Sequence, residues 1–318
     1  MKPPYEVTSL ILKYISSISE KIGVINAKHL VKTNPTLRKQ NQIKTIQSSL
    51  SIEGNTLSEE QITALLENKR VIGPEKDITE VMNALDIYQN LNAFKPHSEK
   101  DFLKAHATLM HHLIKNPGKY RTKSVGIVKG SKVEHIAPPS DNVPYLMKDL
   151  FLYLKDKSEI SLIKSCVFHY EMEFIHPFMD GNGRMGRLWQ TLILREDYFI
   201  FEFLPFETLI SKKQAAYYTA LSASDKEGKS TKFIEYMLGI IDESLSTLLE
   251  NTAKKLSSAD RIEIFIENRL NTFTRKDYLN YFKDLSSATA SRDLRKAVEN
   301  GIIVKDGDKK TTVYNRKK

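Results

Sequence analysis

One run of twelve residues, "HPFMDGNGRMGR" at 176–187, constrains the fold of this 318-residue chain more than any other feature. The segments on both sides have apolar residues at the three- and four-residue spacing that is typical of helices. Pro177 ends the first helix because proline cannot continue the hydrogen-bond ladder. Gly181 and Gly183 allow a tight loop whose backbone amides are not covered by side chains. The sequence therefore predicts a helix, an open loop and a second helix that starts at Arg184.

The residue types in this run point to phosphate chemistry. The loop amides and the positive end of the following helix dipole together form a site for an anion. Arg184 and Arg187 lie three residues apart on one helix face, and two guanidinium groups suit a polyphosphate. Asp180 offers the hard oxygen ligand that a phosphate-bound Mg²⁺ accepts, and His176 can take a proton from a hydroxyl near neutral pH. Each residue alone is common in ordinary loops, but the combination predicts phosphoryl or nucleotidyl transfer.

Most of the rest of the chain has helical periodicity. We expect helices at 8–25, 57–69, 77–94, 99–114, 143–156, 159–175, 184–197, 211–224 and 230–256. Thr56 followed by Glu59 has the pattern of a capping box at the start of the second of these. Residues 120–140 differ, because their apolar residues alternate around a "KGS" turn. They predict a β-hairpin, which needs the helical body as support.

Hydropathy and cysteine content exclude several classes of protein. No apolar run approaches the roughly 18 residues that a membrane span requires, so we expect no membrane partner. The first residues lack the basic and apolar blocks of a signal peptide, and the expected location is the cytoplasm. The single Cys166 cannot form an internal disulfide or a cysteine-pair zinc site. Its apolar neighbours predict a buried hydrophobic residue rather than a nucleophile.

The basic charge is concentrated at the C-terminal end. Residues 251–318 hold 16 Lys and Arg against 9 Asp and Glu, within a chain whose net charge is +9. The pattern there is helix, turn, helix and two strands around a glycine turn, as in a winged helix-turn-helix with a recognition helix at 287–300. The basic residues that would suit DNA phosphates are Arg292, Arg295, Lys296, Lys309, Lys310, Arg316, Lys317 and Lys318. Asp293 and Glu299 dilute this positive surface, and a domain that binds protein or forms a homodimer fits the same charges.

The run at 176–187 resembles the signature of the Fic family, His-Pro-Phe-x-Asp/Glu-Gly-Asn-Gly-Arg-x-x-Arg, at every defined position. The segments "HYEMEFI", "KYRTKSVGIV", "IAPPSDNVPYLM" and "AAYY" are also similar to that family, so that the resemblance covers residues 40–245. It implies a mainly α fold, in which a helical Fic core carries a β-hairpin flap. It also implies a protein adenylyltransferase, which moves AMP from ATP to a Ser, Thr or Tyr hydroxyl of a target protein and releases pyrophosphate.

The resemblance also implies a role for each position of the signature. His176 would be the general base, and Asp180 would hold Mg²⁺. The anion hole and the sites for the outer phosphates of ATP would be formed by Gly181, Asn182, Gly183, Arg184 and Arg187. Phe178 would anchor the loop in the core. Outside the signature, Tyr217 matches a tyrosine of the adenine pocket, and the edge of the flap that binds the target would consist of Val133, Glu134, His135 and Ile136.

A second stretch, "SSLSIEGN" at 48–55, carries one acid among small and apolar residues. Glu53 followed by Gly54 has the pattern of a helix end, but an acid in the last turn opposes the helix dipole and needs compensation. The stretch resembles the inhibitory motif of the Fic family, Ser/Thr-x-x-x-Glu-Gly/Asn, at Ser49, Glu53 and Gly54. The resemblance implies that Glu53 pairs with Arg187 in place of the ATP γ-phosphate, so that the enzyme inhibits itself.

These patterns predict three domains: an N-terminal helical region at 1–95, a Fic core at 96–250 and a winged helix-turn-helix at 256–318. Alternatives remain at this point. One alternative is a DNA-binding transcription regulator whose Fic core acts as a sensor. Another is a Fic enzyme that removes AMP or transfers phosphate or phosphocholine. The sequence does not name the target protein or the oligomeric state.

Overall fold

The computed structural model describes residues 2–27, 35–129, 132–253, 258–267, 272–282, 285–308 and 312–316. The chain divides into two compact units, one formed by Met1–Gly23 with Lys39–Ser246 and the other by Val24–Arg38 with Thr247–Lys318. Within the described ranges, no helix combines the length and the apolar character that a bilayer span needs. The division into the three predicted domains stays a prediction.

The first unit is mainly helical, as the sequence predicts. Its elements are α1 (Ser9–Ala27), α2 (Pro35–Ile52), α3 (Glu59–Leu66), α4 (Glu75–Gln89), α5 (Glu99–Leu109), β1 (Gly126–Lys129), β2 (Lys132–Ile136), α6 (Val143–Leu154), α7 (Ser161–Ile175), α8 (Asn182–Asp197), α9 (Glu207–Lys212), α10 (Gln214–Glu227) and α11 (Thr231–Ala253), with short 3-10 turns at Leu91–Ala93, Ser140–Asn142 and Phe199–Glu202. Parts of α1, α2 and α11 belong to the second unit.

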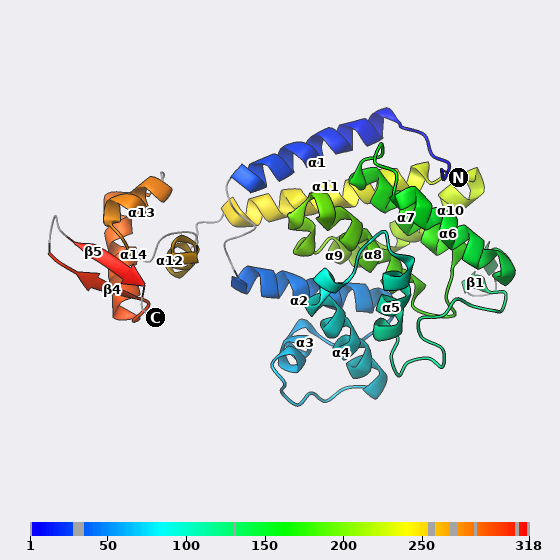
Figure 1. Ribbon diagram of the computed structural model, residues 1–318, viewed down its shortest axis with the longest axis horizontal. Coiled ribbons are helices and arrows are strands. Elements are labelled where there is room, and N and C mark those ends of the chain that lie inside the picture. Colours follow the sequence, from blue (N-terminus) through cyan, green and yellow to red (C-terminus); the bar gives the residue numbers. More distant parts are fainter. Residues whose placement is uncertain are drawn as a thin grey trace. The chain divides into compact units, whose positions relative to one another are not determined.

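Helices α7 and α8 form the core of the first unit, and α5 and α6 pack against them (Figure 1). Almost every residue of α8 up to Leu194 is buried, because neighbours cover it on all sides. The ring of Phe102 lies at the centre, 4.9 Å from the ring of Trp189 and 5.4 Å from that of Phe151. Such aromatic contacts add to the free energy of burial. They fix α8, and therefore the loop that precedes it.

Helix α2 lies against α9 through polar as well as apolar contacts. The hydroxyl of Ser48 lies 3.0 Å from that of Thr208, and the hydroxyl of Ser51 lies 3.1 Å from that of Ser211. A hydroxyl pair of this kind contributes little net stability, since both groups bind water equally well when they separate. The hydroxyl pairs thus fix how α2 aligns with α9, in addition to the apolar contacts between them.

Strands β1 and β2 pair antiparallel, and a bulge lies between Ile127 and Val128. This confirms the predicted hairpin, although Gly130 and Ser131 of its predicted turn lie outside the described residues. Strand β2 contacts α10, which supplies the support that a two-stranded hairpin needs.

Two local predictions are wrong. The cap of α3 is Ser58, whose side chain exchanges hydrogen bonds with Gln61 in a capping box, whereas the Thr56 hydroxyl donates to Asp77 at 2.7 Å. Helix α5 ends at Leu109 rather than at residue 114. The amide of Asn83 donates to the carbonyls of Leu109 and His111, and thereby satisfies the oxygens at this helix end.

The second unit contains α12 (Ser258–Glu267), β3 (Thr272–Phe273), α13 (Arg275–Tyr281), α14 (Ser287–Glu299), β4 (Ile303–Asp306) and β5 (Val313–Arg316). The strands form an antiparallel sheet in the order β3-β5-β4. The order of elements agrees with the sequence prediction, and the assignment as a winged helix-turn-helix stays a prediction. Of the basic residues predicted there, Lys309, Lys310, Lys317 and Lys318 lie outside the described residues.

Asp293 does not lie on the exposed surface of α14, which corrects the expectation that it dilutes the positive charge there. Its side chain is 1% exposed. Both carboxylate oxygens accept hydrogen bonds from Arg261, at 2.6 and 2.9 Å, and the Tyr278 hydroxyl donates to the carboxylate at 3.1 Å. A buried carboxylate needs such partners. Arg292, Arg295 and Lys296 remain exposed.

Candidate active site

The loop between α7 and α8 begins at His176, whose backbone is left-handed with φ of +49°. Arg121 holds this turn in place. Its guanidinium donates to the carbonyl of His176 at 2.8 Å and to that of Ile175 at 3.2 Å, and it also contacts the carbonyl of Pro138. Arg121 is buried, and it joins the loop to the residues on both sides of the hairpin. The sequence gives no signal for this role, because it depends on three separate segments.

The middle of the loop is closed by Asn182. Its side-chain oxygen accepts from the Phe178 amide, and its side-chain nitrogen donates to the Phe178 carbonyl, both at 2.9 Å. Asn182 is 2% exposed and Phe178 is fully buried. The structure confirms that Phe178 anchors the loop in the core. Asn182 fixes the shape of the predicted anion hole through these two bonds to its own loop.

His106 on α5 supports the loop from beneath. The amide of Gly118 donates to Nδ1 at 2.8 Å, so Nε2 carries the proton and donates to the Asp180 carbonyl at 3.0 Å. Burial lowers the pKa of His106 to about 4, and the ring is neutral. It stacks on Phe178 with ring centroids 3.5 Å apart. At Gly181, whose φ is +86°, a Cβ atom would lie 2.7 Å from the sulfur of Met110, which explains the glycine.

Asp180 presents its carboxylate at the start of α8. One oxygen, Oδ1, accepts from the Gly181 amide at 2.6 Å and from Arg184 at 3.0 Å, and the side chain is 51% exposed. The Gly181 amide is therefore engaged by Asp180. An exposed carboxylate with one oriented oxygen fits a Mg²⁺ ion that takes its other ligands from phosphate and water. Among the described residues, no group of three or more His, Cys, Asp or Glu forms a cation cage.

Arg184 is buried between two acids. It donates to Glu80 at 2.9 Å and to Asp180 at 3.0 Å, and the side chains of Arg184 and Glu80 are each 4% exposed. The amide of Asn55 holds the second oxygen of Glu80 at 2.9 Å. Arg184 Nε is buried and has no acceptor among the described residues. Arg184 thus orients Asp180 and keeps one N–H available.

Arg187 is buried beside α2. Its side chain donates to the Ser49 hydroxyl at 2.9 Å, to the Ser49 carbonyl at 3.0 Å and to Glu53 at 2.7 Å. Burial by itself lowers the pKa of Arg187, but Glu53 and the other acidic groups nearby together outweigh this effect, and the pKa is raised. A Cβ atom at Gly183 would lie 2.5 Å from Glu53 Oε1. The carboxylate therefore lies directly against the first turn of α8.

Tyr217 is 2% exposed, and its hydroxyl donates to His169 Nε2 at 3.1 Å. The other ring nitrogen of His169 donates to Gln190 at 2.7 Å. Burial lowers the pKa of His169 to about 3, which keeps the ring neutral as this network requires. The place of Tyr217 in an adenine pocket stays a prediction. Cys166 is fully buried, and burial raises its pKa to about 12, as expected for a structural thiol.

The structure brings the sequence-predicted residues together in part. Ser49 and Glu53 meet Gly183 and Arg187 at the N-terminal end of α8, and Gly54 directly follows Glu53. The backbone of Val133–Ile136 lies in β2, and the side chains of these flap residues are outside the described part. Residues that the sequence analysis missed are Glu80, His106, Arg121, His169 and Gln190.

Comparison with known proteins matches residues 96–194 to the Fic/DOC family. The protein adenylyltransferase fic-1 of Caenorhabditis elegans is 31% identical over 202 residues, which span 59% of this chain and 37% of the relative. The protein adenylyltransferase Fic of Drosophila mojavensis is 28% identical over 255 residues, which span 75% of this chain and 48% of the relative. The chain thus spans half or less of the length of these curated relatives.

Solved structures agree along a greater share of the chain. A Fic family protein from Desulfovibrio desulfuricans G20 is 37% identical with a TM-score of 0.77, and the match covers 100% of this chain and 98% of that one. Residues 134–508 of Fic-1 from C. elegans are 22% identical with a TM-score of 0.64, and the match covers 77% of this chain and 73% of that one. The second match shows a shared fold.

Proposed function

Because the chain belongs to the Fic family, we propose that it is a protein adenylyltransferase. It transfers AMP from ATP to a Ser, Thr or Tyr hydroxyl of a target protein or of itself. The observation that carries the proposal is that Asp180 and Arg187 meet at the N-terminal end of α8, where a polyphosphate is favoured, and that His176 begins the same loop. The names of the curated relatives support the same activity.

His176 is the base in this reaction. Its Nδ1 lies 3.4 Å from the Glu173 carbonyl, which favours the tautomer with the proton on Nδ1 and the lone pair on Nε2. Nε2 takes the proton of the target hydroxyl as its oxygen attacks the α-phosphorus of ATP. The bond from that phosphorus to the bridging oxygen breaks, and pyrophosphate leaves with the bonding electrons.

The start of α8 neutralises the phosphates. The first amides of a helix have no acceptor within it, so those at 182–184 are oriented toward an anion. Arg187 supplies a guanidinium that is already held by Ser49. Asp180 would hold Mg²⁺, which neutralises phosphate charge when bound.

Glu53 inhibits the enzyme in this proposal. Its carboxylate occupies the Arg187 donor at 2.7 Å and lies against Gly183, where an outer phosphate would otherwise lie. Two anions cannot share that donor without strong repulsion. ATP therefore binds with its phosphates displaced, or does not bind, until α2 moves.

The test uses wild type, Glu53→Gly and the double variant Glu53→Gly/His176→Ala, each with Mg²⁺ and with ATP labelled at the α or the γ position. We expect label from the α position on Glu53→Gly, little on wild type and none on the double variant. Label from the γ position would instead mean phosphate transfer. Absence of both labels, combined with loss of AMP from a modified protein, would favour AMP removal.

A second function, DNA binding by the second unit, is supported by one observation. Asp293 is turned inward, which leaves Arg292, Arg295 and Lys296 as charges on the exposed surface of α14, although Glu299 lies 3.7 Å from Arg295. Gel retardation with mixed duplexes at low salt should show a complex that Arg292→Glu/Lys296→Glu loses. No retardation by the wild type would exclude this function.

A further inference from the structure

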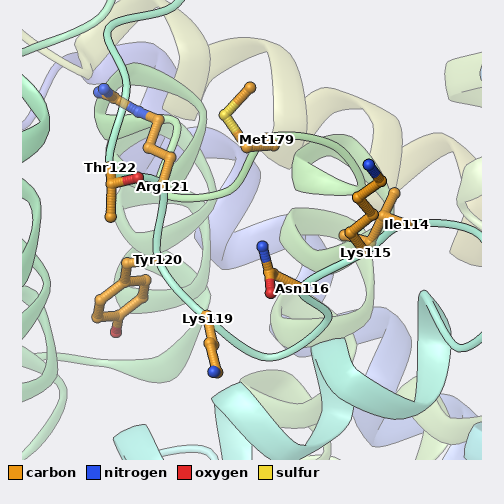
Figure 2. A pocket seen from close by; sticks show the side chains of 8 residues that line it. All are labelled: Ile114, Lys115, Asn116, Lys119, Tyr120, Arg121, Thr122 and Met179. Atoms are coloured by element: carbon orange, nitrogen blue, oxygen red, sulfur yellow. The ribbon is translucent and has the colours of Figure 1, made fainter.

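A pocket of about 410 Å³ lies on the first unit beside the signature loop. Met179, between His176 and Asp180, forms one wall, and the segment from α5 toward β1 bends around the rest (Figure 2). Its lining residues are Ile114, Lys115, Asn116, Lys119, Tyr120, Arg121, Thr122 and Met179. None of the signature positions with an assigned role points into it. The pocket therefore holds none of the groups that carry out the reaction described above.

The charge around this pocket is of one sign. From residue 102 to residue 133 the chain contains seven Lys and Arg and no Asp or Glu. Lys115 and Lys119 are exposed, and neither has an acid partner within the described ranges. Figure 2 shows their side chains on different sides of the pocket, with Asn116 between them. A concave site with positive walls attracts an anionic group.

Two acids near the pocket each accept from a donor of their own. Glu99 accepts a hydrogen bond from the Tyr120 hydroxyl at 2.9 Å. Asp180 is paired with Arg184 at 3.0 Å. Arg121 is also engaged, because its guanidinium donates to backbone carbonyls. The two lysines are thus the cations that remain for a ligand.

The position of the pocket identifies the occupant. Arg121 joins the pocket wall directly to the carbonyl of His176, and Thr122 precedes β1 by a few residues. Under the proposed function the modified hydroxyl lies at His176, so target residues that flank it lie near this wall. We propose that the pocket binds an acidic side chain, Asp or Glu, that lies near the modified hydroxyl in the target protein. This inference rests on the proposed function, because it names the class of target for the same site.

Lys115 and Lys119 are specificity residues in this proposal. They hold the carboxylate of the target by charge and do not touch the reacting atoms. Their ammonium groups end long flexible chains, so they tolerate Asp and Glu alike. The Asn116 amide and the Thr122 hydroxyl supply hydrogen bonds to the same group.

The test measures peptide binding by fluorescence anisotropy, which does not require turnover. The probes are a short dye-labelled peptide with one tyrosine among glutamates and a matched peptide with glutamine in place of glutamate. The proteins are full-length Glu53→Gly, the same chain with Lys115→Glu/Lys119→Glu, and a matched control with Lys148→Glu/Lys157→Glu. Lys148 and Lys157 are also exposed lysines, and they do not line the pocket.

We expect the glutamate peptide to bind Glu53→Gly about tenfold more tightly than the glutamine peptide, with a preference that weakens in high salt. Lys115→Glu/Lys119→Glu should abolish the preference, and the control variant should retain it. Equal binding of the two peptides, no binding of either, or equal losses in the two lysine variants would overturn the proposal. Self-labelling of Glu53→Gly from α-labelled ATP is measured in parallel. Its absence counts against adenylyl transfer, and its presence without peptide preference counts against the pocket alone.

Discussion

Two buried arginines on one helix, Arg184 and Arg187, each pair with a glutamate, but one glutamate is buried and the other is partly exposed. Arg184 pairs with Glu80, which is 4% exposed and is fixed by the Asn55 amide. Arg187 pairs with Glu53, whose side chain is 30% exposed. Both pairs satisfy a guanidinium that burial would otherwise penalise. The first pair is part of the core, whereas the second closes a site that opens to solvent.

The difference separates a structural ion pair from a replaceable one. Without Glu80, the guanidinium of Arg184 would be buried with one counter-charge fewer. The pair should therefore contribute to the stability of the fold. The acid on Arg187 lies at the end of α2, which is held to α9 partly by hydroxyl pairs. A phosphate can replace it on the same donor. Stability should therefore depend on Arg184 and its partner, and regulation on Arg187 and its partner.

The largest expected effect is on folding. Glu80→Gln leaves Arg184 with one fewer buried counter-charge and should lower the free energy of unfolding by about 3 kcal/mol or more. Urea denaturation followed by circular dichroism measures this loss. Lys76→Gln is the control, because Lys76 lies 3.9 Å from Glu80 but is 70% exposed. It should cost about 0.5 kcal/mol or less. Similar losses in both variants would break the distinction between the two arginines.

The next effect is on activity. Glu53→Gly removes a charge-assisted contact of about 2–3 kcal/mol and should raise self-labelling about a hundredfold. Glu53→Gln should fall between wild type and Glu53→Gly, because a neutral amide oxygen still accepts from Arg187 but more weakly. Initial rates with α-labelled ATP provide the comparison. If Glu53→Gly and wild type label at the same rate, Glu53 is as structural as Glu80.

A third effect concerns a second acid near Arg187. Glu207 is fully buried, and burial raises its pKa from 4.5 to about 8, although the Arg187 charge opposes this rise. The folded protein therefore holds a proton that the unfolded chain releases above pH 4.5. The contribution of Glu207 to the free energy of unfolding is greatest below that pH. It falls as the pH rises toward 8, by about 1.4 kcal/mol for each pH unit. Because Glu207 is neutral, Glu53 is the acid that balances the charge of Arg187.

Glu207→Gln should remove this slope. Between about pH 6 and about pH 8 the wild type should lose about 2 kcal/mol more stability than the variant, measured by urea denaturation at a series of pH values. Parallel pH profiles in the two proteins would mean that Glu207 is ionised in the folded state. Arg187 would then have two charged partners, as Arg184 does.

The smallest effect tests the attachment of α2. Ser51→Ala removes the hydroxyl contact with Ser211 and should weaken the closed position by about 0.7 kcal/mol, which raises self-labelling about threefold. Thr219→Ala is the control, because its hydroxyl donates to the carbonyl of Ala215 within the same helix. Equal rates in Ser51→Ala and wild type would show that the hydroxyl contact between Ser51 and Ser211 does not hold α2 in the closed position.

The sequence predicted the local parts of the site because their information is local. Within 176–187, the proline, the glycines and the arginines lie a few residues apart, and their spacing is enough to indicate a loop followed by a helix. The hairpin and most helices follow from apolar periodicity for the same reason. The pairing of Glu53 with Arg187, which are 134 residues apart, came from the family resemblance and not from any spacing.

The missed residues act across the fold. Glu80 meets Arg184 across 104 positions, His106 meets Asp180 across 74 and Arg121 meets His176 across 55. Each is a common residue type on an ordinary amphipathic segment, and nothing nearby marks it. The wrong cap at Thr56 has the same origin, since Asp77 on another helix takes its hydroxyl. The roles of these residues depend on tertiary contacts, which local patterns in a single sequence do not indicate.

The two hydrogen bonds between the Asn182 side chain and the Phe178 backbone order the signature loop in the folded protein, and this order affects the entropy of nucleotide binding. Ordering a flexible residue costs about 1–2 kcal/mol of conformational entropy, and a loose loop would lose that amount for each residue fixed around a nucleotide. Here the ordering takes place during folding. Nucleotide binding should therefore carry a small entropic penalty, and calorimetry should find the damage of Asn182→Ala in the entropy of binding more than in its enthalpy.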